Sequence, residues 1–206
     1  MIQFFETIRL ENGQYSHLEF HLERAAKTQI HHYDKANFDV SLLFNAIPDS
    51  AEGIFRVRVD YGRKIENIAV YPYEVKDHHT LDLVEIEAFD YSFKYSDRTF
   101  FEQELKRRTG ISDLIFVKEG YLTDTTYCNI LLFDGERWVT PHTPLLRGTK
   151  RSYLLQTKQI FEKAITASEI TTYKKIAFIN AMRDFEKVYR FTRENDTLHL
   201  TMDTNE

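Results

Sequence analysis

The chain contains little cysteine, glycine or proline, the residues that cross-link small folds or interrupt regular structure. Its 206 residues include one cysteine, Cys128, so no disulfide can form within the chain and no multi-cysteine zinc site exists. With only 7 glycines and 4 prolines, the composition excludes collagen and low-complexity disorder. Adjacent histidines point in different directions on any regular element, so we expect no metal site. A chain of this length can bury enough surface to fold without such supports.

Excess basic charge and long apolar runs are also lacking. The chain has 27 Lys and Arg against 32 Asp and Glu, and the formal charge of −5 argues against a nucleic-acid partner. No segment approaches the ~20 apolar residues that cross a bilayer. Gln3 and Glu6 interrupt the N-terminus, where a signal peptide would need an apolar run. We therefore expect a cytoplasmic protein that binds neither nucleic acid nor membrane.

What the sequence does contain is a series of turn signals between β-rich runs. Asn12-Gly13 and Asp134-Gly135 tolerate the positive φ angles of a type I′ turn, so each predicts a two-residue hairpin loop. The strands that these turns join are 2–10 with 15–18, and 127–133 with 136–140. Further strands are predicted at 54–59, 65–71, 84–88, 114–117, 177–179 and 187–191.

Apolar residues at helical spacing predict four helices between these strands. They cover 19–32, a short segment ending at Phe44, 98–108 with Asp97 as the N-cap, and 148 or 149 to 164. Strands and helices do not alternate regularly, so the order favours an α+β fold over a doubly wound α/β fold. The charged segment 75–79 is the expected border between a small N-terminal α/β domain, residues 1–78, and a larger C-terminal α+β domain, residues 79–206.

Three groups of residues could carry chemistry. Lys94 is flanked by aromatic residues, and a lysine in a partly dry setting loses its proton more readily, which suits Schiff-base chemistry. The helix start at Gly148-Thr149-Lys150 offers free N–H groups and a positive dipole end to a phosphate. His21 and Arg24 share one helix face and could hold an anion. Taken alone, each group has a plainer explanation: a surface lysine, a loop-to-helix junction and a covered helix surface.

Four blocks of sequence stand in a fixed order along the chain. They are Phe5-Glu6-Thr7-Ile8-Arg9 followed by His21-Leu22-Glu23-Arg24; Lys94-Tyr95-Ser96-Asp97-Arg98; Gly120-Tyr121-Leu122-Thr123-Asp124 with Asn129 and Thr140-Pro141; and Leu146-Arg147-Gly148-Thr149-Lys150-Arg151. They are similar to F-E-T-x-R with H-x-x-R-L, K-x-x-N-R, G-x-V-T-E-x-x-x-x-N with T-P, and L-P-G-I-T-R. In this order the blocks resemble the class IV pyridoxal-phosphate aminotransferases, which include branched-chain and D-amino-acid transaminases and aminodeoxychorismate lyase.

The resemblance implies the class IV aminotransferase fold, whose two domains grip pyridoxal 5′-phosphate. It implies that Lys94 is the Schiff-base lysine and shuttles a proton as general base and acid. Asp124 would face the pyridine nitrogen, and Arg24 would bind the cofactor phosphate. Further phosphate contacts would come from the helix start at Gly148, Thr149 and Lys150.

The resemblance also implies a small-molecule substrate and a homodimer whose active site is closed by the partner subunit. Arg9 and Arg98 are the candidates for binding substrate carboxylates. Asn180-Ala181-Met182 resembles a late segment of the lyases and, with the first two blocks, favours aminodeoxychorismate lyase. The implied reaction is elimination of pyruvate from aminodeoxychorismate, leaving 4-aminobenzoate for folate synthesis. The alternatives are a branched-chain or D-amino-acid transaminase and an inactive homologue that binds the cofactor without turnover.

The chain departs from the family pattern at several positions. Asp124 stands where the family has glutamate, Arg147 replaces the loop proline, and Lys150 replaces the threonine of G-I-T-R. The chain also starts inside the segment that precedes F-E-T-x-R in longer members, so we expect an N-terminal strand to be missing or replaced. These departures make the substrate harder to predict than the cofactor.

Overall fold

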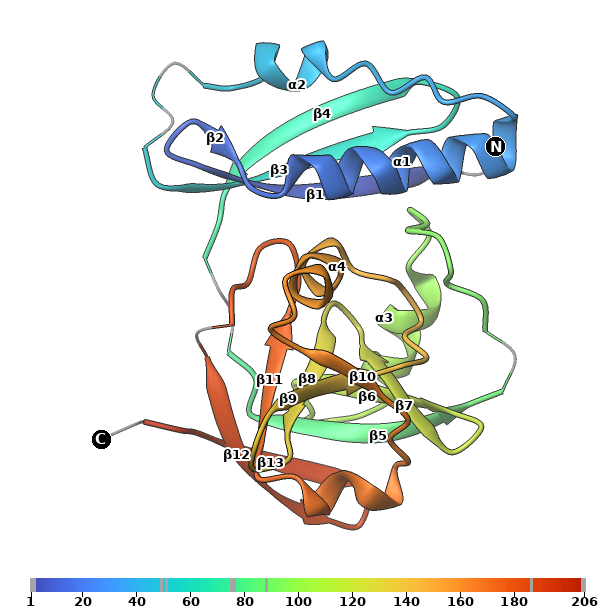
Figure 1. Ribbon diagram of the computed structural model, residues 1–206. Coiled ribbons are helices and arrows are strands. Elements are labelled where there is room, and N and C mark those ends of the chain that lie inside the picture. Colours follow the sequence, from blue (N-terminus) through green and yellow to red (C-terminus); the bar gives the residue numbers. More distant parts are fainter. Residues whose placement is uncertain are drawn as a thin grey trace. The chain divides into compact units, whose positions relative to one another are not determined.

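A computed structural model describes residues 3–48, 50, 52–74, 77–87, 89–185 and 187–204 (Figure 1). The chain divides into two compact units. Unit 1 comprises Met1–Val75 and Phe93–Asp97, and unit 2 comprises Lys76–Ser92 and Arg98–Glu206. Of the predicted border segment 75–79, Val75 and Lys76 lie outside the described residues.

The segment that carries Lys94 belongs to unit 1, whereas the sequence analysis placed it in the C-terminal domain. The cause is pairing with the first strand. The Phe5 N–H donates to the Lys94 carbonyl at 3.0 Å, and the Ser96 N–H donates to the Gln3 carbonyl at 2.9 Å. Tyr95 also forms an antiparallel bridge with Phe4. Because these partners are distant in sequence, no local pattern predicts the pairing.

Unit 1 is a four-stranded antiparallel sheet with two helices. In spatial order the strands are β2 (Gln14–Tyr15), β1 (Phe4–Glu11), β3 (Ile54–Tyr61) and β4 (Ile65–Pro72). The helices are α1 (Leu18–Tyr33) and α2 (Ser41–Asn45). Asn12 and Gly13 have φ angles of 48° and 79°, which confirms the first predicted hairpin turn.

One face of this sheet is apolar and is covered by the two helices. Alternate side chains of β1 point to the same face of a sheet, and four of them are buried: Phe4, Glu6, Ile8 and Leu10. Ile8 and Leu10 pack with Leu43 of α2, while Phe4 clusters with Ala25 of α1. Glu6 is the charged member of this set, so the strand carries a carboxylate into the core of unit 1.

Unit 2 is a mixed nine-stranded sheet that closes on itself. In spatial order the strands are β10 (Phe161–Lys163), β9 (Trp138–Pro141), β8 (Asn129–Phe133), β11 (Lys175–Ile179), β12 (Val188–Glu194), β13 (Thr197–Met202), β5 (Thr80–Ile86), β6 (Asp113–Lys118) and β7 (Tyr121–Thr125). Asp124 of β7 pairs with Asn129 of β8, so the strands from β8 round to β7 form a closed barrel. The remaining elements are α3 (Thr99–Lys106), α4 (Thr149–Gln156) and the 3-10 helix η1 (Ser168–Thr172). The predicted α+β class is confirmed.

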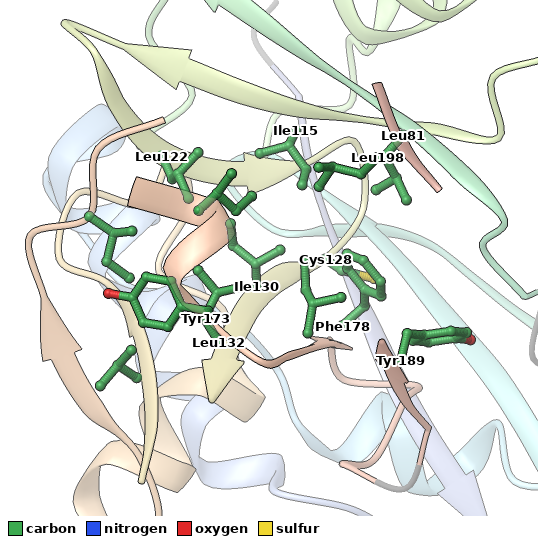
Figure 2. Packing of buried hydrophobic residues seen from close by; sticks show 14 of the residues in the cluster. Leu81, Ile115, Leu122, Cys128, Ile130, Leu132, Tyr173, Phe178, Tyr189 and Leu198 are labelled. Atoms are coloured by element: carbon green, nitrogen blue, oxygen red, sulfur yellow. The ribbon is translucent and has the colours of Figure 1, made fainter. Parts of the chain in front are cut away.

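The barrel encloses the main hydrophobic core (Figure 2). Ile130 and Leu132 of β8 lie in this core, whereas Leu131 between them packs with Leu154 of α4. This alternation places α4 against the outer surface of the barrel wall. Within the described residues, no helix combines the length and apolar character needed to cross a membrane.

The last predicted helix is wrong in length, because α4 ends at Gln156 and not at residue 164. Lys158 adopts a φ of 57°, the Lys158 N–H donates to the Leu155 carbonyl, and the Gln159 N–H donates to the Leu154 carbonyl. These two bonds are those of a Schellman motif, which ends a helix and usually requires glycine at the left-handed position. A lysine at that position hides the stop signal in the sequence.

Three further expectations need correction. The second hairpin has a longer loop than Asp134-Gly135 predicts, because Phe133 pairs with Trp138 and residues 134–137 connect the strands. The Asp134 carboxylate accepts the N–H groups of the two residues that follow Gly135, which stabilises this longer loop. At α3 the N-cap position is Arg98, one residue after the predicted Asp97. Strands β10 and β13 were not predicted, and of the predicted strand 84–88, Ala88 lies outside the described residues.

Candidate active site

Lys94 lies at the edge of β1 with its ammonium group above an aromatic ring. Its carbonyl is paired with the Phe5 N–H, and its Nζ lies 4.6 Å from the centroid of the Phe5 ring. The negative face of an aromatic ring attracts a cation. Backbone pairing and ring contact therefore fix the amine at one place on unit 1.

A buried polar cluster lies in the same unit. The carboxylate of Glu6, which is fully buried, is 2.6 Å from Nδ1 of His21 and accepts a hydrogen bond of 2.9 Å from Nε of Arg24. A second bond from Nη2 of Arg24 makes that contact two-pronged. The sequence suggested that His21 and Arg24 could hold an anion, and in the structure they hold the carboxylate of Glu6.

The pKa values in this cluster follow from burial and charge. Burial alone would raise the pKa of Glu6, but the charge of Arg24 and the hydrogen bonds from His21 and Arg24 overcome it and hold the pKa at about 2. Burial lowers the pKa of His21, and the nearby charges of Arg24 and Lys94 lower it further, against the opposing effect of Glu6. At neutral pH the cluster therefore contains an ionised Glu6 and a neutral His21 that donates its Nδ1–H. Arg24 and Lys94 both lie close enough to His21 for their charges to act on it.

In unit 2, Asp124 lies where the barrel closes. Its Oδ1 accepts a hydrogen bond of 2.6 Å from Nδ2 of Asn129, and its Oδ2 accepts one of 2.8 Å from the Leu146 N–H. Burial raises the pKa of this carboxyl to about 7, although these donors and the charge of Arg151 oppose the rise. The result is an acid in the barrel wall that can hold or give up a proton near neutral pH.

The start of α4 packs tightly against this acid. Gly148 adjoins the Asn129 side chain so closely that a Cβ at this position would lie 2.1 Å from Asn129 Oδ1. Thr149 and the buried Lys150 follow, and the Lys150 ammonium pairs with the Asp184 carboxylate. The Lys150 side chain is thus engaged within unit 2, while the first N–H groups of α4 have no acceptor inside the helix itself. A bound anion would meet backbone donors here.

Arg151 and the candidate substrate arginines are held by internal partners. Arg151 is buried and donates to the Pro141 carbonyl at 2.9 Å. Arg9 donates to the Glu11 carboxylate from Nε at 3.2 Å and from Nη2 at 3.1 Å. Arg98 donates to the Tyr91 hydroxyl at 3.0 Å. Unit 1 thus brings together the predicted Lys94 and Arg24, and unit 2 brings together the predicted Asp124 and the residues that open α4.

The comparison with protein families decides the assignment. The family profile described as "Amino-transferase class IV" matches residues 68–190, which is more than half of the chain. The chain belongs to the class IV aminotransferase family. An uncharacterized protein of Haemophilus influenzae (strain ATCC 51907 / DSM 11121 / KW20 / Rd) is 32% identical to this family member over 185 residues, which cover 88% of this chain and 98% of that protein.

Solved structures agree with this class IV assignment. A chain described as a putative 4-amino-4-deoxychorismate lyase from Haemophilus somnus 129PT is 31% identical, with a TM-score of 0.80 over 88% of this chain and 97% of that chain. A hypothetical aminotransferase from Mycobacterium tuberculosis in its PLP-bound form has a TM-score of 0.72 at 19% identity, over 87% of this chain and 78% of that chain. The second comparison shows a shared fold. Binding of pyridoxal phosphate is therefore established for a structure of this fold.

Three residues that shape the site had no role predicted from the sequence. Glu6 had a signal, since it is a carboxylate at an inward position of a strand that alternates with apolar residues. Asn129 and Arg151 fell inside the quoted motifs, but their roles depend on which loops they reach. Asn129 also donates to the Leu146 carbonyl at 2.9 Å, and Arg151 reaches Pro141 across the barrel edge. Contacts of this kind join segments that spacing along the chain does not relate.

Proposed function

We propose that the protein is a pyridoxal-phosphate-dependent aminodeoxychorismate lyase, which releases pyruvate and 4-aminobenzoate for folate synthesis. The observation that carries the proposal is that each unit, taken by itself, groups residues of the family motifs: Lys94 and Arg24 around His21 in unit 1, and the buried acid Asp124 beside the start of α4 in unit 2. Similarity to the Haemophilus somnus chain favours a lyase as the reaction.

The residues present fit pyridoxal phosphate. Arg24 is a cation that Glu6 holds in place through Nε and Nη2, and its charge would attract a phosphate, while the amide N–H groups of Thr149 and Lys150 are backbone donors at a helix start. Asp124 has a pKa of about 7, so a basic ring nitrogen beside it would share its proton and leave a carboxylate paired with a pyridinium. Lys94 would bind the aldehyde covalently. When bound, the cofactor supplies an electron-withdrawing ring that acidifies the proton beside the substrate amine.

Lys94, Asp124 and Arg24 would each have a defined task in the elimination. Lys94 Nζ removes the proton from the carbon that bears the substrate amine, and the C–H electron pair forms a ring double bond. The C–O bond to the pyruvyl group breaks, and that group leaves with the C–O electron pair and takes up a proton to become pyruvate. Asp124 would hold a proton for the ring nitrogen of the cofactor, and Arg24 would hold its phosphate, so that the reacting carbon stays near Lys94.

The test is incubation of the protein with chorismate, glutamine and an aminodeoxychorismate synthase, with 4-aminobenzoate and pyruvate as readouts. We expect both products with wild type and neither above background with Lys94→Ala. Lys106→Ala, which changes the exposed C-terminal end of α3, serves as the matched control and keeps full activity. A parallel assay with pairs of amino acids and keto acids tests a transaminase, and product there but not in the lyase assay would refute the proposal.

Cofactor attachment is tested separately from turnover. Borohydride reduction of the protein saturated with pyridoxal phosphate, followed by peptide mapping, is expected to label Lys94. A label on Lys106, or no label, contradicts the assignment. A label on Lys94 without turnover in either assay would identify a cofactor-binding homologue that is not an enzyme.

A further inference from the structure

The segment that carries Lys94 is a short excursion of the chain from unit 2 into unit 1. The chain leaves unit 2 after Ser92 and returns to it at Arg98. Consecutive Cα atoms are 3.8 Å apart, so the Cα of Lys94 lies no more than about 11 Å from that of Tyr91 and about 15 Å from that of Arg98. Whatever fixes Tyr91 and Arg98 therefore limits where Lys94 can be.

Tyr91 and Arg98, one on each side of this excursion, are fastened to each other. Nη1 of Arg98 donates to the Tyr91 hydroxyl at 3.0 Å, and Nη2 donates to the Thr126 carbonyl. The guanidinium carbon lies 4.7 Å from the Phe101 ring centroid and 4.5 Å from that of Tyr127. A planar cation between aromatic rings, with two hydrogen bonds to fixed acceptors, has little freedom to move. We call the contacts of Arg98 with Tyr91 and Thr126 the Arg98 clamp.

The acceptors of the clamp are themselves held in place. Tyr91 is 5% exposed, so its hydroxyl cannot turn freely to solvent. Thr126 is anchored by Asp113, whose buried carboxylate accepts the Thr126 N–H at 3.2 Å and the Thr126 hydroxyl. A substrate carboxylate that approached Arg98 would have to share the guanidinium with the Tyr91 hydroxyl and the Thr126 carbonyl, which already take one donor from each terminal nitrogen, and with the rings of Phe101 and Tyr127.

We propose that Arg98 is a positioning residue, which closes the base of the Lys94 segment and holds Lys94 in register with β1, and that it is not a ligand of the substrate carboxylate. The inference rests on the proposed role of Lys94. Tyr91 would then share the task of Arg98, because the bond between its hydroxyl and Arg98 joins the two ends of the segment 93–97. A role in substrate binding would give Tyr91 no such task.

The variants Tyr91→Phe and Arg98→Lys test the proposal, with Tyr121→Phe as the matched control because it removes a hydroxyl from a partly exposed ring on β7. Loss of one hydrogen bond to a charged group corresponds to about a tenfold change in an equilibrium. In the protein without cofactor, we expect hydrogen exchange of the Ser96 amide, which is bonded to Gln3, to speed up about tenfold in both variants. The amides of β3 and β8 and the control variant should be unchanged.

With cofactor and substrate, both variants should form the reducible bond between Lys94 and pyridoxal phosphate more slowly. In each, kcat should fall about tenfold while KM stays within about threefold of wild type. The double variant should have no lower kcat than the more impaired single variant, because the bond between Arg98 and the Tyr91 hydroxyl is lost in all three. A large rise in KM for Arg98→Lys with wild-type behaviour of Tyr91→Phe would assign Arg98 to the substrate and overturn the proposal.

Unchanged exchange of the Ser96 amide in both variants would also overturn it, whatever the kinetics show. If wild type neither binds pyridoxal phosphate nor turns over substrate, the proposed function fails, and the exchange measurement still decides whether the clamp orders the segment.

Discussion

Asp124 is nearly enclosed by the barrel wall, yet both of its carboxylate oxygens are occupied by donors. Aspartate is one methylene shorter than the glutamate of the family motif, and the contacts with Asn129 and Leu146 show how the shorter side chain is held. A glutamate at this position would bring an extra methylene into a buried site where both carboxylate oxygens are already held by donors.

The raised pKa of Asp124 predicts a pH dependence of stability without cofactor. An acid with a pKa of about 7 when folded and 3.8 when unfolded keeps its proton only in the folded state across this interval. Stability therefore falls as the pH rises from about 4 to 7, by roughly 4 kcal/mol at most. Asp124→Asn has no such titration. In urea unfolding, its free energy of unfolding minus that of wild type should therefore increase from pH 5 to pH 7.5. An equal difference at both pH values would contradict the raised pKa.

Site residues could be predicted where they stand at a motif position. They could not be predicted where their role depends on a contact with a residue distant in sequence. Lys94, Arg24 and Asp124 stand at motif positions, and the structure places each among charged or polar neighbours. The partnership of Arg24 with Glu6 could not be read from spacing, because it joins a strand to a helix through a buried face. Arg98 matched a motif as a candidate for the substrate, while its observed partners are a tyrosine hydroxyl and a carbonyl.

At the scale of elements, most strands and the first hairpin were predicted well, whereas the loop of the second hairpin is longer than its turn signal indicates. The pair β1–β2 follows the Asn12-Gly13 turn signal, which lies in the loop itself. Errors arose where an element ends at an unusual residue. Lys158 ends α4 in the left-handed conformation that glycine usually adopts. Propensity was a poor guide there because the two capping hydrogen bonds override it.

We expect Arg24 of α1 to contribute more to binding of the cofactor phosphate than the Lys150 side chain of α4. Arg24→Lys keeps a positive charge beside Glu6 but loses the two-pronged bond that holds the side chain in place, so affinity for pyridoxal phosphate should fall about tenfold. Lys150→Ala should change it less than threefold, because its side chain is paired with Asp184 and the backbone N–H survives. Absorbance titration of the cofactor-free protein measures both. Equal losses in the two variants would contradict this division.

Whole-molecule architecture depends on pairings that turn signals do not encode. Barrel closure requires β7 to meet β8 through Asp124 and Asn129, and β13 to meet β5 across more than half of the chain. The α+β class could be predicted because it needs only the order of the elements. The ring could not, since its register is decided by which inward faces pack together in three dimensions.

We expect the protein to form a homodimer in solution. The family resemblance implies that the partner subunit closes each active site, and unit 1 exposes apolar side chains suited to an interface, with Ile30 and Phe44 each 55% exposed. Sedimentation at micromolar concentration should give twice the chain mass of 24.5 kDa. A fully active monomer at that concentration would contradict the expectation.

The excursion of Phe93–Asp97 into unit 1 also has a consequence for synthesis on the ribosome. Residues up to Val75 emerge first, but the edge of β1 stays unpaired until the tyrosine at position 95 has been made. At ~5–20 residues per second, the nascent chain waits roughly one to four seconds for that partner. During this interval β5 of unit 2 is already being made, so synthesis of unit 2 begins before unit 1 is complete. A truncated gene that stops at the apparent border would leave this edge open permanently.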